Sequence, residues 1–429
     1  MVENAPADHG AHGENLHDIA IVGGGLVGAA AALGAALQGW RVLLLDRAEP
    51  AWEPGRLGMD IRNVAVSPAS MALLDELGVW RDQQAIAYSH MRVWEEQGTR
   101  RIDFDAADVQ RYELGWIAEN GPLVASLWQR LRAQDGITIR TADRLIGLDP
   151  GTEAVKLHLT RHGEQASAAA PTASERLRAR LVVGADGARS AVRQLLDVSV
   201  EAFDTGHHAL ATVIRTSNPH DGTAFQRFLL DGPLALLPGR HPRQSSVVWS
   251  QPPASAERRA ALSDAAFCQE IASASEHCLG SVEEVDQRMV FPLQQMLAAS
   301  FNPVPRVLLI GDAGRVLHPL AGLGANLGFE DVRDLLNELD GLLPGGDPGA
   351  AGTWASFARR RRIRSRLMVD IMGGLRRAYA SNDPLLQWLR NLGVGWVDSS
   401  GLLKRQIIRE ALGLGPLARV SRRSLEPEL

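Results

Sequence analysis

Three glycines near the N-terminus stand at the spacing of a phosphate-binding turn. Gly23, Gly25 and Gly28 follow the apolar run 18–22, which has the composition of a buried parallel strand. The first glycine permits a tight turn, the second permits close approach of a pyrophosphate, and the third permits close packing of helix on strand. Segment 29–38 is alanine-rich and strongly helix-forming, and the N-terminus of such a helix directs free N–H groups at phosphates. The spacing therefore predicts a dinucleotide site.

A second apolar strand, 41–45, ends in Asp46 and is followed by Arg47. An acidic residue about 20 residues after the glycines suits hydrogen bonds to ribose hydroxyls. Asp46 also argues against an NADP site here, because a 2′-phosphate would meet a carboxylate. The predicted site therefore adds Leu26, Val27, Asp46 and Arg47 to the three glycines. This motif does not separate FAD from NAD, and a glycine-rich turn of another α/β protein is the alternative.

Two later apolar strands end in turns of glycine and aspartate. Strand 181–183 leads into the Gly-Ala-Asp-Gly turn 184–187, and strand 306–310 leads into Gly311 and Asp312. Because ligands of open α/β sheets bind at the carboxyl ends of strands, all three motifs converge on one crevice. In this order and spacing they predict an FAD site, in which each motif contacts a different part of the cofactor.

The three motifs together resemble those of the class A FAD-dependent monooxygenases, which have the para-hydroxybenzoate hydroxylase fold. Within that class the likeness is to the hydroxylases of ubiquinone biosynthesis. Residues 311–332 read GDAGRVLHPLAGLGANLGFEDV, where that family typically reads GDAAHxxHPxAGQGxNLGxxDV. Further matches are DIR at 60–62, AVS at 65–67, GPLALLP at 232–238, FPL at 291–293 and the segment 403–413. The likeness extends from residue 18 to residue 415.

The resemblance implies roles for residues of the second and third turns. Asp186, with Gly187, would lie near the pyrophosphate and the approach route of the nicotinamide. Asp312, with Gly311, would hydrogen-bond the ribityl chain. Arg62 would lie near the flavin or its phosphates, with a solvated surface guanidinium as the alternative.

The segment after the third turn would border the flavin ring. By resemblance, Gly324, Ala325 and Asn326 begin a helix whose N–H groups face the pyrimidine ring, where a helix N-terminus stabilises the negative charge of reduced flavin. His318 and Pro319 would line the flavin. Phenol hydroxylation requires a base, and His318 is a weak candidate, because shaping of the loop is the preferred interpretation. The sequence leaves the catalytic base unassigned.

The sequence departs from the family pattern at three sites. Gly314-Arg315 replaces the common Ala-His, Leu323 replaces the common Gln, and Gln226 stands where the family often has Glu. FAD binding does not depend on these side chains, because it rests on glycines, aspartates and backbone. The departures therefore bear on the substrate and the reductase partner.

The chain has 429 residues and is long enough for two interleaved lobes. No run of 18 apolar residues is present, so no transmembrane helix is predicted. Segment 1–17 is polar and reads as a disordered tail rather than a signal peptide. Cys268 and Cys278 are predicted to be reduced structural thiols of a cytoplasmic protein. The histidines form no HExxH pattern, so no metal is predicted.

Charge is distributed unevenly along the chain. The whole chain has 45 Lys and Arg against 50 Asp and Glu, whereas residues 351–429 have 15 against 6. The densest basic run is 359–366. Its preferred interpretation is a solvated helix face that pairs with the acidic body. The alternative is a surface for anionic lipid at the inner membrane face or for an acidic partner protein. Nucleic acid is not expected, because no aromatic residues interleave with the basic ones.

The predicted fold is α/β, with an FAD-binding Rossmann-like domain interleaved with an antiparallel-sheet substrate domain and followed by C-terminal helices. The expected ranges are a disordered tail at 1–17, FAD-binding parts at 18–87, 119–200 and 298–343, substrate-domain parts at 88–118 and 201–297, and a C-terminal helical region at 344–429.

The sequence thus predicts an FAD-dependent aromatic hydroxylase. The resemblance implies insertion of one atom of O2 through a flavin C4a-hydroperoxide, on a lipid-tailed phenol intermediate of ubiquinone biosynthesis. NAD(P)H or a separate reductase would supply electrons, and other ubiquinone-biosynthesis proteins would be partners. Two alternatives stay open: a hydroxylase of a small soluble aromatic, and a non-catalytic flavoprotein subunit of a biosynthetic complex.

Overall fold

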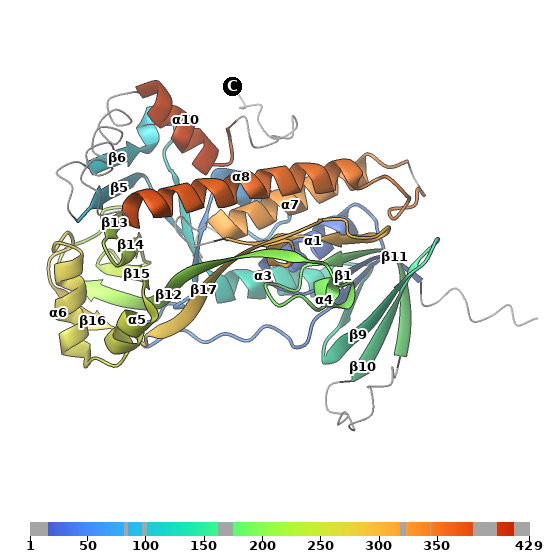
Figure 1. Ribbon diagram of the computed structural model, residues 1–429, viewed down its shortest axis with the longest axis horizontal. Helices are drawn as coiled ribbons and strands as arrows, with labels where there is room; N and C mark the ends of the chain where they lie inside the picture. Colours follow the sequence, from blue (N-terminus) through green and yellow to red (C-terminus); the bar gives the residue numbers. More distant parts are fainter. Residues whose placement is uncertain are drawn as a thin grey trace, which may run out of the picture.

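The computed structural model describes residues 16–80, 85–96, 101–161, 175–317, 323–343, 345–380 and 401–415. Within these residues the chain forms two lobes, each built on a sheet, and the long strands β12 and β17 run from one lobe to the other (Figure 1). The described residues include the three predicted turns, the three sites that depart from the family pattern and the C-terminal helices. Residues 318–322 lie outside the described residues.

The first lobe is built on a sheet with strand order β8-β2-β1-β11-β10-β9, in which β18 also pairs with β11. The strands that carry the three motifs are parallel neighbours, whereas β9 and β10 extend the sheet with antiparallel pairing. The strands are β1 (Leu16–Val22), β2 (Val42–Leu45), β8 (Ile137–Arg140), β9 (Asp143–Pro150), β10 (Val155–Arg161), β11 (Glu175–Gly184) and β18 (Val307–Leu309). This sheet, with its parallel central strands, is the predicted α/β arrangement.

The first strand begins earlier than the sequence predicted. Leu16 and His17 pair with Arg178 and Ala179 of β11, so they belong to β1 rather than to an N-terminal tail. The polar character of His17 concealed this, because backbone pairing extends a strand past the end of its apolar run. The remainder of the expected tail, 1–15, lies outside the described residues.

Helices cover the first sheet. Alanine-rich α1 (Leu26–Leu37) packs against α3 (Asn120–Ala133) and α7 (Leu323–Asp340). Its small side chains permit close approach, and a Cβ at Gly34 would lie 2.5 Å from the Leu336 side chain. Two shorter helices complete this lobe, α2 (Pro68–Glu76) and α4 (Ala191–Leu195).

The second lobe is built on a sheet with strand order β19-β17-β12-β15-β14-β13-β5-β6, in which β16 also pairs with β12. Pairing is antiparallel, except between β13 and β5. The strands are β5 (His90–Glu95), β6 (Arg101–Asp105), β12 (Val200–Thr216), β13 (Thr223–Leu229), β14 (Gly232–Pro238), β15 (Gln244–Gln251), β16 (Val282–Val285), β17 (Met289–Ala298) and β19 (Arg315–Val316). Helices α5 (Pro253–Ala260) and α6 (Asp264–Ala274) cover one face, and Trp249 is buried there as expected of a core residue.

A third sheet divides the segment 88–118, which the sequence assigned entirely to the substrate domain. Strands β5 and β6 join the second lobe, but β7 (Gly115–Glu119) pairs with β3 (Asn63–Val66) and β4 (Ala85–Tyr88). Alternation of side chains identifies strands but not their partners, so the sequence could not separate these two destinations.

Two helices follow in the C-terminal region. Helix α8 (Ala355–Ala380) lies along α7 and contacts β17, so it spans both lobes (Figure 1). Helix α10 (Gly401–Ala411) packs on the short 3-10 helix η2 (Ala106–Val109), where Ile408 and Leu412 share a buried cluster with Leu114. In the part of the chain that the structure describes, no helix is long and apolar enough to cross a membrane.

Candidate cofactor site

The structure brings the three predicted turns together at one edge of the first sheet. Strand β11 pairs in parallel with β1 on one side and with β18 on the other, so Val22, Gly184 and Leu309 lie in one row. The turns that follow these residues therefore leave the sheet side by side, at its carboxyl edge. This adjacency was the central expectation from the sequence.

The first turn is shaped by contacts that exclude a side chain at two glycines. Gly23 has φ +105°, and a Cβ there would overlap the carbonyl oxygen of Ala185 in the second turn. A Cβ at Gly28 would overlap the carbonyl oxygen of Gly23. Gly25 differs, because a Cβ built on it meets no atom within 4 Å. Gly23 and Gly28 thus serve the packing of the turn, and Gly25 leaves open the space that a pyrophosphate requires.

Both backbone polar groups of Gly24 are hydrogen-bonded by side chains. Its N–H donates to Asp46 Oδ2 at 2.5 Å, and its carbonyl accepts from Trp128 Nε1 at 2.7 Å. Trp128, on α3, is buried. Asp46 therefore braces the glycine turn, a role in addition to the predicted contact with ribose. Trp128 could not be identified from the sequence, because an aromatic residue in an apolar helix pattern indicates only core packing.

The second turn is braced by its own aspartate. Asp186 Oδ2 accepts from the N–H groups of Ala191 and Val192 at 2.6 and 3.2 Å, so it caps the N-terminus of α4. Arg193 then links the second turn to the third, because it donates to the carbonyls of Ala188 at 2.6 Å and Ala313 at 3.0 Å. Burial lowers the pKa of Arg193, and the charge of Asp186 opposes that shift. The predicted approach of Asp186 to the nicotinamide stays a prediction.

In the third turn, Asp312 is exposed to solvent but has protein atoms close around its carboxyl group. Gly311 has φ +57°, and its N–H donates to Asp331 Oδ2 at 2.8 Å. Desolvation by the surrounding protein atoms raises the pKa of Asp312, Arg315 lowers it, and Asp331 raises it further. The carboxylate is thus placed to gain from a hydrogen-bond donor such as a ribityl hydroxyl.

Helix α7 begins at Leu323, where the resemblance placed a helix N-terminus at the flavin. Asn326 does not direct its amide at open space, because Nδ2 donates to Ala65 O at 2.7 Å and Oδ1 accepts from Ser67 N at 2.9 Å. It therefore ties α7 to the end of β3. A Cβ at Gly324 would meet no atom within 4 Å, so the backbone of the first turn is approachable.

The remaining predicted residues are either at the surface or outside the described residues. Arg47 is exposed, and exposed Arg62 lies 4.0 Å from Asp60. For Arg62 this is the solvated arrangement that the sequence analysis gave as the alternative. His318 and Pro319, with their predicted place at the flavin, lie outside the described residues.

One face of the second sheet looks toward the first lobe. Asn63 Nδ2, at the start of β3, donates to Ser246 Oγ of β15 at 3.1 Å. Because side chains alternate along a strand, Ser250 of β15 lies on this same face, and Trp249 lies on the opposite face against α6. Gln226, one of the three departures, follows Phe225 of the α6 face and is therefore on the face toward the first lobe.

A bulge in β12 aims a histidine at this face. The pairing of β12 with β17 shifts between Asp204 and His208, and Gly206 within the bulge has φ +64°. His207 Nδ1 lies 3.1 Å from Ser250 Oγ. Bulges commonly re-aim side chains next to active sites. No sequence pattern indicated His207, because a bulge depends on the partner strand.

The donor set and the shape of the three turns fit FAD. Gly25, Gly187 and Gly324 leave unfilled space beside the backbone, and Asp312 offers a partly desolvated carboxylate. Among the described residues, no group of three His, Cys, Asp or Glu side chains is arranged to hold a metal ion.

Comparison with known proteins agrees with this geometry. A family model described as "FAD binding domain" matches residues 17–370. The chain is 36% identical to the 3-demethoxyubiquinol 3-hydroxylase of Escherichia coli over 92% of this chain and 98% of that protein. It is 31% identical to ubiquinone hydroxylase UbiL of Rhodospirillum rubrum over 94% of this chain and 92% of that protein. The crystal structure of p-nitrophenol 4-monooxygenase PnpA from Pseudomonas putida superposes with a TM-score of 0.72 and 20% identity, covering 94% of this chain and 99% of that one.

Proposed function

The chain belongs to the ubiquinone-biosynthesis hydroxylases, a group of FAD-dependent monooxygenases. We propose that its substrate is a prenylated benzoquinol that lacks one ring oxygen. The predicted fold class, FAD cofactor and enzyme class are thereby confirmed. The observation that carries the substrate proposal is the alignment with the E. coli 3-demethoxyubiquinol 3-hydroxylase, which covers nearly all of both chains. Bound FAD, reduced by NAD(P)H or by a reductase, supplies the activation of O2, and the protein supplies position and a proton acceptor.

The face of the second sheet toward the first lobe suits an apolar ring with a tail. Ala209 and Ala211 of β12 lie on this face and are buried. Their partners on β17, Phe291 and Met289, are 40% and 42% exposed. Exposed Phe291 and Met289 thus lie next to buried Ala209 and Ala211. Together these apolar side chains form a path from the interior to the edge of the sheet. We assign this path to the prenyl tail.

The proton acceptor in this proposal is His207. A base within hydrogen-bond reach of the substrate hydroxyl makes the ring electron-rich. In this proposal Nδ1–H of His207 donates to Ser250 Oγ, and Nε2 takes the hydroxyl proton when substrate binds; the proton returns to the same oxygen when the aromatic product is restored. His208 is the matched control, because it is adjacent in sequence but lies with Leu210 on the α6 side of the sheet.

The test of the base compares His207→Gln with His208→Gln in the FAD-loaded protein. The first variant is expected to lose about 10²–10⁴-fold in kcat, and the limb of the pH profile that reports the base should disappear, while FAD binding is retained. The second variant should keep its pH profile. An unchanged profile in His207→Gln would remove His207 from the mechanism.

The outward face of α8 supports contact with an anionic membrane surface. Ile363 and Ile371 are 63% and 41% exposed, and Arg359, Arg362 and Arg366 flank them. We propose that this face meets the headgroups of the membrane that holds the substrate. Sedimentation of the full chain with phosphatidylglycerol vesicles should exceed that with phosphatidylcholine vesicles, and Ile363→Glu should reduce it. Equal sedimentation with both vesicle types would contradict membrane contact.

The substrate proposal is tested first in a strain that lacks this protein. Mass spectrometry of the quinone pool should show loss of ubiquinone and build-up of a prenylated precursor one oxygen short. In a strain without a redundant hydroxylase, an unchanged pool would redirect the search to small soluble aromatics. Purified protein that binds FAD but forms no hydroxylated product from a short-tailed quinol would favour the non-catalytic alternative.

A further inference from the structure

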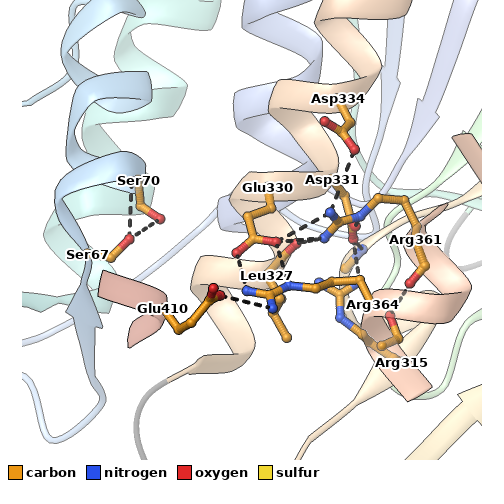
Figure 2. A network of polar contacts seen from close by, with 12 residues as sticks. Ser67, Ser70, Arg315, Leu327, Glu330, Asp331, Asp334, Arg361, Arg364 and Glu410 are labelled. Carbon is orange, nitrogen blue, oxygen red and sulfur yellow. Dashed lines mark hydrogen bonds and ion pairs between the residues drawn. The ribbon is translucent and has the colours of Figure 1, made fainter. Parts of the chain in front are cut away.

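The basic run of α8 has an inward half that no role described so far explains. Arg361 and Arg364 are 5% and 8% exposed, whereas Arg359, Arg362 and Arg366 face solvent. Figure 2 shows the two buried guanidinium groups pointing into the acidic side of α7. Four carboxylates surround them: Glu330, Asp331 and Asp334 of α7, and Glu410 of α10. The sequence analysis predicted pairing with the acidic body, and this half of the run is buried as well as paired.

Asp331 is the centre of the cluster and is fully buried. One of its oxygens, Oδ2, accepts from Gly311 N at 2.8 Å and from Arg315 Nη1 at 2.6 Å. The other, Oδ1, accepts from Arg361 Nε at 2.5 Å. One carboxylate thus joins the third cofactor turn to β19 and to α8, which lies 50 residues further along the chain from Gly311.

The orientation of Asp331 depends on Arg361. A buried carboxylate needs its charge compensated, and loss of one partner of such a pair leaves the other uncompensated. Arg315 bonds only Oδ2 of Asp331, whereas the bond to Oδ1 comes from Arg361, so the two arginines hold different oxygens of the carboxylate. Arg361 contacts Glu330 at 3.2 Å and the carbonyl of Leu327 at 3.2 Å in addition to Asp331, so its own position is fixed. Burial by itself would lower the pKa of Arg361, but the charges of Asp331, Glu330 and Asp334 outweigh it and raise that pKa. The guanidinium therefore stays charged.

Arg364 provides an internal comparison. It is buried on the same helix and lies 3.4 Å from Glu330 and 3.6 Å from Glu410. It makes no contact with Asp331 in the described structure (Figure 2). The two arginines thus share burial, helix and charge, and they differ in their link to the Gly311 turn.

We propose that Arg361 is a positioning residue for FAD: through Asp331 it fixes the Gly311–Asp312 turn in the conformation that receives the cofactor. Helix α8 then belongs functionally to the cofactor site although it reaches the site only through α7. Because the cofactor class is established for this family, the inference does not depend on the identity of the aromatic substrate.

The test compares Arg361→Met with Arg364→Met in the full chain. Both variants are expected to lower the Tm of the apoprotein, because each leaves a buried carboxylate without its partner. Only Arg361→Met should weaken FAD binding, by at least tenfold, in a titration of flavin fluorescence quenching. ADP is the second probe, because it requires the first turn at Gly23–Gly28 but not the third turn. ADP affinity should be unchanged in both variants.

The outcomes separate a positioning role from a purely structural one. Equal loss of FAD affinity in both arginine variants, or loss of ADP affinity together with FAD affinity, would overturn the proposal. If Arg361→Met fails to fold, Arg361→Lys replaces it, with Arg364→Lys as its control. Lysine keeps the charge but cannot bond Asp331, Glu330 and the Leu327 carbonyl together. Arg361→Lys should therefore fold and still bind FAD more weakly than Arg364→Lys, and equal affinities would contradict the proposal.

Discussion

The glycine turn after β1 and the Gly-Asp turn after β18 serve the same cofactor but are held by different forces. The glycine turn is fixed by steric contact at Gly23 and Gly28 and by two hydrogen bonds to the backbone of Gly24. The Gly-Asp turn is fixed by Asp331, a buried carboxylate whose partners come from β19 and α8. The first turn is therefore held by close backbone packing and by single hydrogen bonds to Asp46 and Trp128, whereas the Gly-Asp turn depends on compensation between buried charges, one of which α8 supplies.

The largest expected effect breaks the steric turn. Gly28→Ala places a Cβ on the Gly23 carbonyl, so overpacking should cost about 1–3 kcal/mol and abolish FAD retention. Gly25→Ala is the matched variant, since its Cβ meets no protein atom. Its apoprotein should lose at most about 1 kcal/mol of stability, while its FAD affinity falls at least tenfold. Thermal unfolding of the apoprotein and FAD titration measure both, and tight FAD binding by Gly25→Ala would show that the pyrophosphate lies elsewhere.

A smaller loss of FAD binding than in Gly28→Ala is expected when one of the two hydrogen bonds to the Gly24 backbone is removed. Trp128→Phe keeps an aromatic side chain but removes the pyrrole ring with its N–H donor to the Gly24 carbonyl, which is left unpaired at a cost of about 1–3 kcal/mol. FAD affinity and stability should both fall, because the backbone of Gly24 also shapes the phosphate site. Retention of wild-type affinity would mean that Asp46 suffices to hold the turn.

The contribution of Asp312, in the Gly-Asp turn, to the stability of the apoprotein is expected to depend on pH. Burial raises the pKa of Asp312, so the ionised carboxylate destabilises the folded apoprotein above that pKa. Asp312→Asn should therefore be more stable than wild type at pH 7. The difference should shrink as the pH falls through the raised pKa toward the ordinary aspartate value of about 3.9. FAD should bind more weakly to the variant, because a charge-assisted hydrogen bond becomes a neutral one. A stability difference that grows on acidification would reverse the sign of this argument.

The smallest effect is expected at Arg62, which is not among the residues described as holding either turn. Its side chain is 56% exposed and 4.0 Å from Asp60. Arg62→Met should change the free energy of unfolding by no more than about 0.5 kcal/mol. FAD titration then decides between its two interpretations, since a drop in affinity would assign it to the cofactor and an unchanged affinity would leave it as a surface residue.

Much of the cofactor site was accessible from the sequence because its chemistry is local. The strand, the glycine spacing and the following helix predicted the first turn, and Asp312 and the start of α7 were identified from short motifs. The sequence did not reveal Trp128, His207 or the link from Arg361 to Asp331. Each of these depends on a partner more than 20 residues away, and neither periodicity nor composition records which distant residue lies opposite. For the same reason the sequence identified strand-like segments between 88 and 118 but not that β7 pairs outside the second lobe.

The sequence by itself determined the class of cofactor and the turns that receive it, because backbone conformation at a glycine and capping by a neighbouring aspartate are set within a few residues. Only the tertiary structure decided which arginines of α8 are internal, because a helix alternates its faces and packing against α7 selects one of them. It also decided that His207 and Ser250 meet on the face toward the first lobe, since a bulge in β12 against β17 sets that orientation. Local rules fix the chemistry that a chain offers, and long-range packing fixes the direction in which that chemistry points.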